Sequence, residues 1–120
     1  MKATIKYFDK AQEYYFQEGC FITEVSNSSD DEGLSIVQAR VEPGRTTAWH
    51  FLTESVERYV ILEGCGEVEL GKQEISRVKA GDVVIIPAGM LQRITNNGKQ
   101  DLKFLAICSP RFKTESYREG

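Results

Sequence analysis

Short stretches rich in β-branched and aromatic residues alternate with turn-forming Gly, Pro, Asn and Asp along most of this chain. These stretches cover residues 20–25, 34–41, 46–52, 57–63, 67–70, 74–78, 83–86, 91–95 and 102–108. Strands that recur about every eight to twelve residues are typical of a β-sandwich or barrel. No segment of useful length has the period of a helix. The pattern therefore predicts an all-β domain.

Turn residues predict how these strands are connected. The polar loop 26–33 predicts a hairpin between 20–25 and 34–41, and Pro43-Gly44 ends the second of these strands. Asn96-Asn97-Gly98 is a tight-turn signal and predicts a hairpin between 91–95 and 102–108. The run 83–86 is apolar at every position, which predicts burial on both faces.

The only histidine, His50, lies in the predicted strand 46–52. Because successive strand side chains point to opposite faces, Ala48, His50 and Leu52 should share one face, with Trp49 and Phe51 on the other. Alone, a histidine between two aromatic residues is more often a hydrogen-bonded core residue than a ligand.

Two spaced motifs resemble those of the cupin superfamily. Gly44, His50, Glu57 and Gly64 match the first motif, and Gly81, Pro87, Gly89 and Asn96 match the second. Leu52 and Gln92 stand where the superfamily usually has two further histidines. The resemblance implies a double-stranded β-helix, or jelly-roll barrel. We predict a single domain over residues 1–120, with 1–17 and 109–120 as flanking arms.

The resemblance also implies a metal site reduced to His50, Glu57 and Gln92. An imidazole, a carboxylate and an amide oxygen would suit a divalent ion such as Mn, Fe, Ni, Co or Zn. Such an ion would keep open positions and act as a Lewis acid on an anionic or enolisable oxygen ligand. In the alternative, Gln92 bonds to His50 in a metal-free pocket. The pocket itself is predicted to be lined by Ala48, Leu52, Tyr59 and Ile94.

Three classes of function follow from this interpretation. The first is a metal-dependent isomerase, lyase or oxygenase acting on a small molecule, with Tyr59 positioning the substrate or transferring a proton. The second is a barrel that binds or senses a small ligand without chemistry, and the third is a structural or partner-binding barrel. Cupins have many unrelated activities, so the sequence does not identify the substrate.

Composition excludes several other classes. The chain has 120 residues and a net charge of −3, and its Lys and Arg residues do not cluster, which argues against a nucleic-acid partner. It contains no apolar run of the length that crosses a bilayer and no apolar secretory signal, so we expect a cytoplasmic protein without a membrane partner. Cys20, Cys65 and Cys108 are odd in number and lack CxxC spacing, so reduced, buried thiols are expected. No Gly-x-Ser-x-Gly elbow accompanies His50, which disfavours a serine triad.

The strand phases also predict a homodimer. Trp49, Phe51, Val60, Leu62, Leu105 and Ile107 fall on the faces opposite the predicted pocket residues. A small domain seldom exposes so much contiguous apolar surface, and two-fold dimers are the commonest assembly that covers such a surface. In the alternative, residues 1–25 of the same chain cover this patch.

Overall fold

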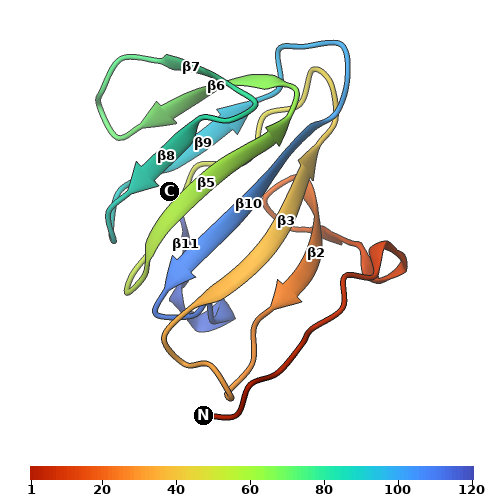
Figure 1. Ribbon diagram of the computed structural model, residues 1–120. Coiled ribbons are helices and arrows are strands. Elements are labelled where there is room, and N and C mark those ends of the chain that lie inside the picture. Colours follow the sequence, from red (N-terminus) through yellow and green to blue (C-terminus); the bar gives the residue numbers. More distant parts are fainter.

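A computed structural model describes all 120 residues and confirms the all-β jelly-roll prediction (Figure 1). It contains eleven strands and two short 3-10 turns. The strands are β1 (Tyr14–Phe16), β2 (Cys20–Ser26), β3 (Ser35–Val41), β4 (His50–Leu52), β5 (Val56–Glu63), β6 (Cys65–Leu70), β7 (Ser76–Lys79), β8 (Val83–Ile86), β9 (Gln92–Thr95), β10 (Leu102–Ser109) and β11 (Tyr117–Glu119), and the turns are η1 (Lys10–Gln12) and η2 (Thr114–Ser116). No helix is long and apolar enough to span a membrane.

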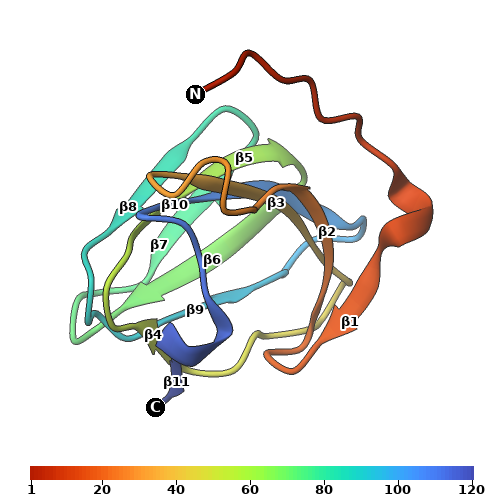
Figure 2. The ribbon, with the colours of Figure 1, turned by 90° about the horizontal axis from the view of Figure 1, so that it is seen from below.

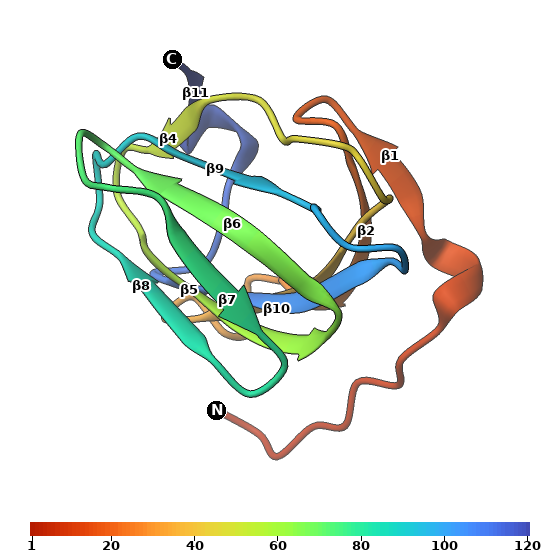
Figure 3. The same ribbon diagram turned by 90° about the horizontal axis from the view of Figure 1, so that it is seen from above.

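The strands form two antiparallel sheets that face each other. One sheet has the order β1-β2-β3-β10-β5-β8, and the other has the order β11-β4-β9-β6-β7. The views along the barrel show the two sheets on opposite sides of its interior (Figures 2 and 3). From β3 onward the chain passes repeatedly from one sheet to the other. Residues distant in the sequence therefore meet inside the barrel.

Alternating side chains of both sheets fill the interior. The main core contains Ile61, Ile86, Ile94, Leu102 and Phe104, each at most 3% exposed. Strand β10 shows the pattern most clearly, because its buried and half-buried residues alternate over its whole length. The core thus follows from the period-two pattern of the sequence.

One predicted hairpin is confirmed and the other is wrong. Strands β2 and β3 pair antiparallel, as the loop 26–33 predicts. Strands β9 and β10 do not pair with each other, because β9 lies between β4 and β6 and β10 lies between β3 and β5. The buried side chain of Asn96 holds the connection by donating to the carbonyls of Val41 and Gln100, both at 2.8 Å. This turn therefore carries the chain from one sheet to the other.

The C-terminal arm is not peripheral, which corrects the expectation for residues 109–120. Strand β11 pairs with β4, with Tyr117 opposite Leu52 and Glu119 opposite His50. At the other terminus, β1 pairs with β2, whereas the residues before η1 form no regular structure and are exposed. The C-terminal residues thus extend the sheet that carries the histidine.

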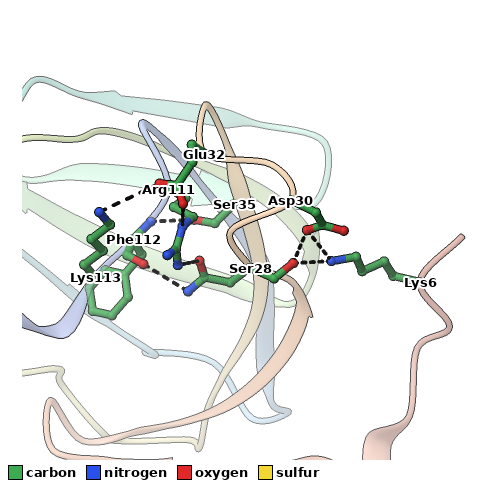
Figure 4. A network of polar contacts seen from close by, with 9 residues as sticks. Lys6, Ser28, Asp30, Glu32, Ser35, Arg111, Phe112 and Lys113 are labelled. Carbon is green, nitrogen blue, oxygen red and sulfur yellow. Dashed lines mark hydrogen bonds and ion pairs between the residues drawn. The ribbon is translucent and has the colours of Figure 1, made fainter. Parts of the chain in front are cut away.

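A polar network fixes the segment that leads into β11 (Figure 4). The backbone N–H of Phe112 donates to Ser35 Oγ at 2.9 Å, and its carbonyl accepts from Asn27 Nδ2 at 3.0 Å. Arg111 pairs with Glu32 at 3.2 Å, and its guanidinium also donates to Asn27 Oδ1 at 3.2 Å. The β2–β3 loop therefore holds the ring of Phe112 in place against the barrel.

The run 83–86 is buried on one face only, contrary to the prediction from its composition. Strand β8 is the edge of the six-stranded sheet, and Val83 and Ile85 are 56% and 64% exposed. Val60, beside Val83, and Leu105, beside Val60, continue an apolar outer face. This face remains exposed although the N-terminal segment is present in the structure.

The predicted apolar patch divides between the two sheets. Val60, Leu62, Leu105 and Ile107 belong to the six-stranded sheet, whereas Trp49 and Phe51 lie at or next to β4 of the other sheet. Arg93 covers the ring of Trp49, with its guanidinium carbon 4.3 Å from the ring centre. The free apolar surface is therefore the outer face of β5, β8 and β10.

We predict that two copies of the chain pair through this outer face. Light scattering at micromolar concentration should give twice the 13.6 kDa of one chain. Ile85→Asp should dissociate the pair, because it places a charge in the apolar interface at its most exposed large side chain on this face. Trp49→Asp, on the other sheet, is the matched control and should leave the dimer intact. A wild-type mass of one chain would contradict the assembly.

Candidate functional site

His50 is held in one orientation at the start of β4. It is 2% exposed, and its Nδ1 lies 2.7 Å from the carbonyl oxygen of Ala48. A carbonyl only accepts hydrogen bonds, so Nδ1 carries a proton and donates it there. Tyr117 stacks on the imidazole, with ring centres 5.2 Å apart and planes inclined by 19°. The opposite nitrogen, Nε2, is therefore held in a fixed position, 3.6 Å from a carboxylate oxygen of Glu18.

Gln92 connects the two sheets next to His50, its partner across the β4–β9 pairing. Tyr59 donates its hydroxyl proton to Gln92 Oε1, and Gln92 Nε2 donates to Glu57 Oε1 at 2.8 Å. All three side chains are buried. Gln92 thus bonds to Glu57 and Tyr59 of β5, rather than to His50 as the metal-free alternative has it.

Glu18 is the site residue that the sequence analysis missed. It lies in the turn between β1 and β2, beside Gly19, whose φ of 97° allows the tight reversal. Its carbonyl accepts from the backbone N–H of Ala48 at 2.7 Å, and its carboxylate Oε2 lies 3.6 Å from His50 Nε2. No motif marks this position, because the turn reaches His50 only after the barrel has closed.

The two carboxyl groups have strongly perturbed acidity. Burial raises the pKa of Glu18 to about 7, although 15% of its side-chain surface remains exposed. Burial, followed by the charge of Glu18, raises the pKa of Glu57 to about 7, against the smaller opposing effects of His50 and Gln92. Two interacting groups of this kind titrate together, so near neutral pH they hold about one proton between them.

A cavity adjoins these groups inside the barrel. It has a volume of about 50 Å³, which is room for roughly three to five water molecules. Its wall is mostly apolar, and its ionisable residues include three carboxyl groups and two thiols but no Lys, Arg or His. The residues that carry polar or reactive groups are Glu18, Glu24, Glu57, Tyr14, Tyr59, Cys20, Asn27, Ser35 and Cys108.

The structure places the predicted pocket residues in different environments. Tyr59 lines the cavity. Ala48 is exposed, because regular pairing begins only at His50 and the alternation does not extend back to residue 48. Leu52 is buried in a small cluster with Cys108 and Tyr117, and Ile94 belongs to the main core. The cysteines also differ from the expectation, since Cys65 is exposed whereas Cys20 and Cys108 are buried and free.

The predicted metal-ligand set of His50, Glu57 and Gln92 does not fit a metal ion in this arrangement. The amide oxygen of Gln92 accepts from Tyr59, and its amide nitrogen, which cannot bind a metal, faces Glu57. No three His, Cys, Asp or Glu side chains of the chain converge as metal ligands. Gln92 instead bonds to Glu57 and Tyr59, and His50 bonds to the carbonyl of Ala48.

Comparison with known proteins agrees with this architecture. The sequence model of the Cupin domain family matches residues 37–108. The uncharacterized protein MJ1618 of Methanocaldococcus jannaschii is 32% identical over 117 residues, which are 96% of this chain and 93% of the relative.

Solved structures share the fold at lower identity. KdgF from Halomonas sp. is 19% identical, with a TM-score of 0.78 over 91% of this chain and 96% of its own. Pac13, described as a unique nucleoside dehydratase, is 19% identical, with a TM-score of 0.78 over 98% and 92%; a variant of the Streptomyces protein was solved with uridine. Oxalate decarboxylase from Bacillus subtilis is 19% identical, with a TM-score of 0.83 over 99% of this chain and 32% of its own.

The raised carboxyl pKa values predict a pH-dependent stability. Both pKa values rise from the ordinary 4.5 to about 7 in the folded protein, so the folded state binds more protons than the unfolded one over this range. The contribution of these bound protons to the free energy of unfolding is therefore fully present below pH 4.5. It is lost as the pH rises through about 7.

Urea unfolding between pH 4.5 and 8 measures this dependence. Glu57→Gln should flatten the fall in unfolding free energy, whereas the matched change Glu54→Gln, in an exposed loop, should not. An equal slope in Glu57→Gln and the wild type would contradict the assignment.

Proposed function

Because the chain belongs to the cupin family, we propose that its barrel binds a small molecule in the cavity and catalyses proton transfer on it, as in isomerases and lyases. The observation that carries this proposal is the pair of desolvated carboxyl groups, Glu18 and Glu57, which both line the cavity, with Glu18 Oε2 3.6 Å from His50 Nε2. A pair that holds about one proton at neutral pH supplies a base and an acid in the same site.

Each side chain has a role that follows from its contacts. The ionised carboxylate takes a proton from a carbon or oxygen atom of the bound molecule, and the protonated carboxyl returns a proton to another atom of it. His50 Nε2 lies 3.6 Å from Glu18 Oε2, and His50 is the only basic residue paired with that carboxyl. Gln92 orients Glu57, and Tyr59 in turn orients Gln92. Tyr59 is therefore a positioning residue.

The energetics favour this proposal over a purely structural barrel. Burial of a carboxyl group costs several kcal/mol unless it is fully paired, and apolar residues of similar volume usually stabilise a core better. Glu18 has no basic partner other than His50, at 3.6 Å. Two such groups beside a cavity are therefore best explained by chemistry or ligand binding. A binding barrel without chemistry is the second candidate, and the exchange experiment below distinguishes the two.

Solvent exchange tests the proposed chemistry on a panel of small candidate substrates. A set of three- to six-carbon hydroxy-ketones, hydroxy-acids and amino-ketones is incubated with the protein in D₂O, and deuterium at carbon is followed by NMR. At least one compound should exchange faster with the wild type than without protein. Glu57→Gln should lower that rate by about 10²-fold or more, because it removes an acid–base group.

The matched control is again Glu54→Gln, which should keep the wild-type rate. Tyr59→Phe should have a smaller effect than Glu57→Gln, because it acts only through Gln92. Exchange that is unchanged in Glu57→Gln would contradict the proposed role. Binding of a compound without any exchange would support the binding barrel instead.

Metal addition tests the conclusion that the donor set does not fit an ion. Manganese, iron(II), nickel, cobalt or zinc at 1 mM should leave the thermal unfolding midpoint of the wild type unchanged, because only ligands that bind the folded state stabilise it. Gln92→His, which replaces the amide with a stronger ligand, is the variant expected to gain a metal-dependent rise. A rise in the wild type that is lost in His50→Ala would show that His50 binds metal.

A further inference from the structure

The wall of the cavity can carry charge of one sign only. Glu18, Glu24 and Glu57 line it, and no Lys, Arg or His side chain does. The tyrosine and cysteine side chains of the wall stay neutral, because burial raises the pKa values of their hydroxyl and thiol groups. Any charge that the wall presents to a ligand is therefore negative.

Arginine side chains next to lining residues in the sequence bond elsewhere. Arg58, in β5, donates to Ser109 Oγ at 2.7 Å, and Arg111, before η2, pairs with Glu32 at 3.2 Å. An anion in the cavity would meet carboxyl groups, and no Lys or Arg side chain, in a medium of low dielectric constant. The charge of the wall thus disfavours an anionic ligand and favours a cationic one.

Glu18 presents a carboxylate with unused accepting capacity. No hydrogen bond of the protein ends on its side chain, and its only basic neighbour is His50, with Nε2 at 3.6 Å from Oε2. The side chain lines the cavity and keeps 15% of its surface accessible, so a ligand can reach it. Glu57, by contrast, already accepts from Gln92 Nε2 at 2.8 Å. Glu18 is therefore the carboxylate with room for a donor from outside the chain.

The acidity of the two carboxyl groups shows that no protein group compensates their charge fully. Burial raises the pKa of Glu18 to about 7, and burial followed by the charge of Glu18 raises the pKa of Glu57 to about 7. An opposite charge within about 4–6 Å favours the ionised form of a carboxyl group. A bound cation would stabilise both ionised groups in this way, which a neutral molecule cannot do.

Aromatic side chains form much of the remaining wall. The lining includes Tyr14, Phe16, Tyr59, Phe104 and Phe112. The faces of aromatic rings attract ammonium groups, and the same rings offer apolar surface to a carbon skeleton. A hydrated inorganic ion would gain little from such a wall. The lining therefore favours an organic cation.

We infer that the cavity takes a compact organic cation, an amine in its ammonium form, and that Glu18 is the carboxylate that pairs with it. The inference rests on the proposed function, because it names the substrate class of the same site. The volume of about 50 Å³ limits the ligand to about five non-hydrogen atoms. An ammonium group brings three donors to a wall that is rich in acceptors. Among the compounds proposed for the exchange experiment, the amino-ketones are the class selected.

Three compounds of similar size test this assignment. At pH 7.5, 1-amino-2-propanol is a cation, 1,2-propanediol is neutral and lactate is an anion. Each is titrated into the wild type at constant ionic strength, with the backbone amide signals of Glu57 and Tyr59 followed by NMR. The amine should bind about tenfold or more tightly than the diol, because only the amine brings a charge opposite to that of the wall. Lactate should bind more weakly than the diol or not at all.

Glu18→Gln keeps the shape of the side chain and removes its charge. It should weaken the binding of the amine about tenfold or more and leave the binding of the diol nearly unchanged. Its thermal midpoint should equal or exceed that of the wild type, because a desolvated carboxyl group without a hydrogen-bond partner does not stabilise the fold. Glu54→Gln, in an exposed loop, is the matched control and should change none of these values.

The outcomes separate this inference from the proposed chemistry. Binding of the amine in preference to the diol, without deuterium exchange of any compound, would support the inference and reject the chemistry. Deuterium exchange that depends on Glu57, with the diol or lactate bound as tightly as the amine, would keep the chemistry and overturn the inference. Failure of the amine to bind the wild type would overturn it whatever the stability of the variant, and so would equal binding of the amine by Glu18→Gln.

Discussion

Desolvation of two carboxyl groups is the constraint around which the inside of this barrel is arranged. Glu18 and Glu57 lie close enough for one charge to act on the other, and no Lys or Arg side chain lines the cavity that they share. Their ionised forms are costly there, so both hold their protons to higher pH than exposed glutamates do. The neighbouring groups are His50, whose Nε2 lies 3.6 Å from Glu18, and Gln92, whose amide donates to Glu57. The pKa values of about 7 place the change in proton content of this site near neutral pH.

The barrel meets this constraint by drawing the site from both sheets and one turn. Glu57 and Tyr59 come from β5 of the six-stranded sheet, and His50, Gln92 and Tyr117 come from the five-stranded one. Gln92 bonds across the gap between the sheets. Glu18 arrives from the β1–β2 turn, which is fixed to residue 48 by a backbone hydrogen bond. Disturbing the packing of either sheet would therefore move the carboxyl groups relative to each other.

The two departures from the cupin motifs have clear structural consequences. Leu52, at one usual histidine position, packs with Cys108 and Tyr117 in an apolar cluster. Gln92, at the other, presents its nitrogen to Glu57 and its oxygen to Tyr59. In many cupins these two positions hold metal ligands. In this chain one side chain packs in the core and the other forms hydrogen bonds. The chain keeps the family's barrel while the side chains at these two positions serve packing and hydrogen bonding inside it.

The sequence alone determined the fold class, most of the strands and the presence of His50, Glu57, Tyr59 and Gln92 at one site, because alternation and motif spacing are local properties. Other features depended on which strands became neighbours. The outward face of β8, the passage of Asn96 between sheets and the pairing of β11 with β4 follow from strand order, which local pattern does not encode. Glu18 and Tyr117 lie 32 and 67 residues from His50 in the sequence, and only closure of the barrel brings them to it. Burial, which sets the acidity of the carboxyl groups, is likewise a property of the closed barrel and was decided by the tertiary structure.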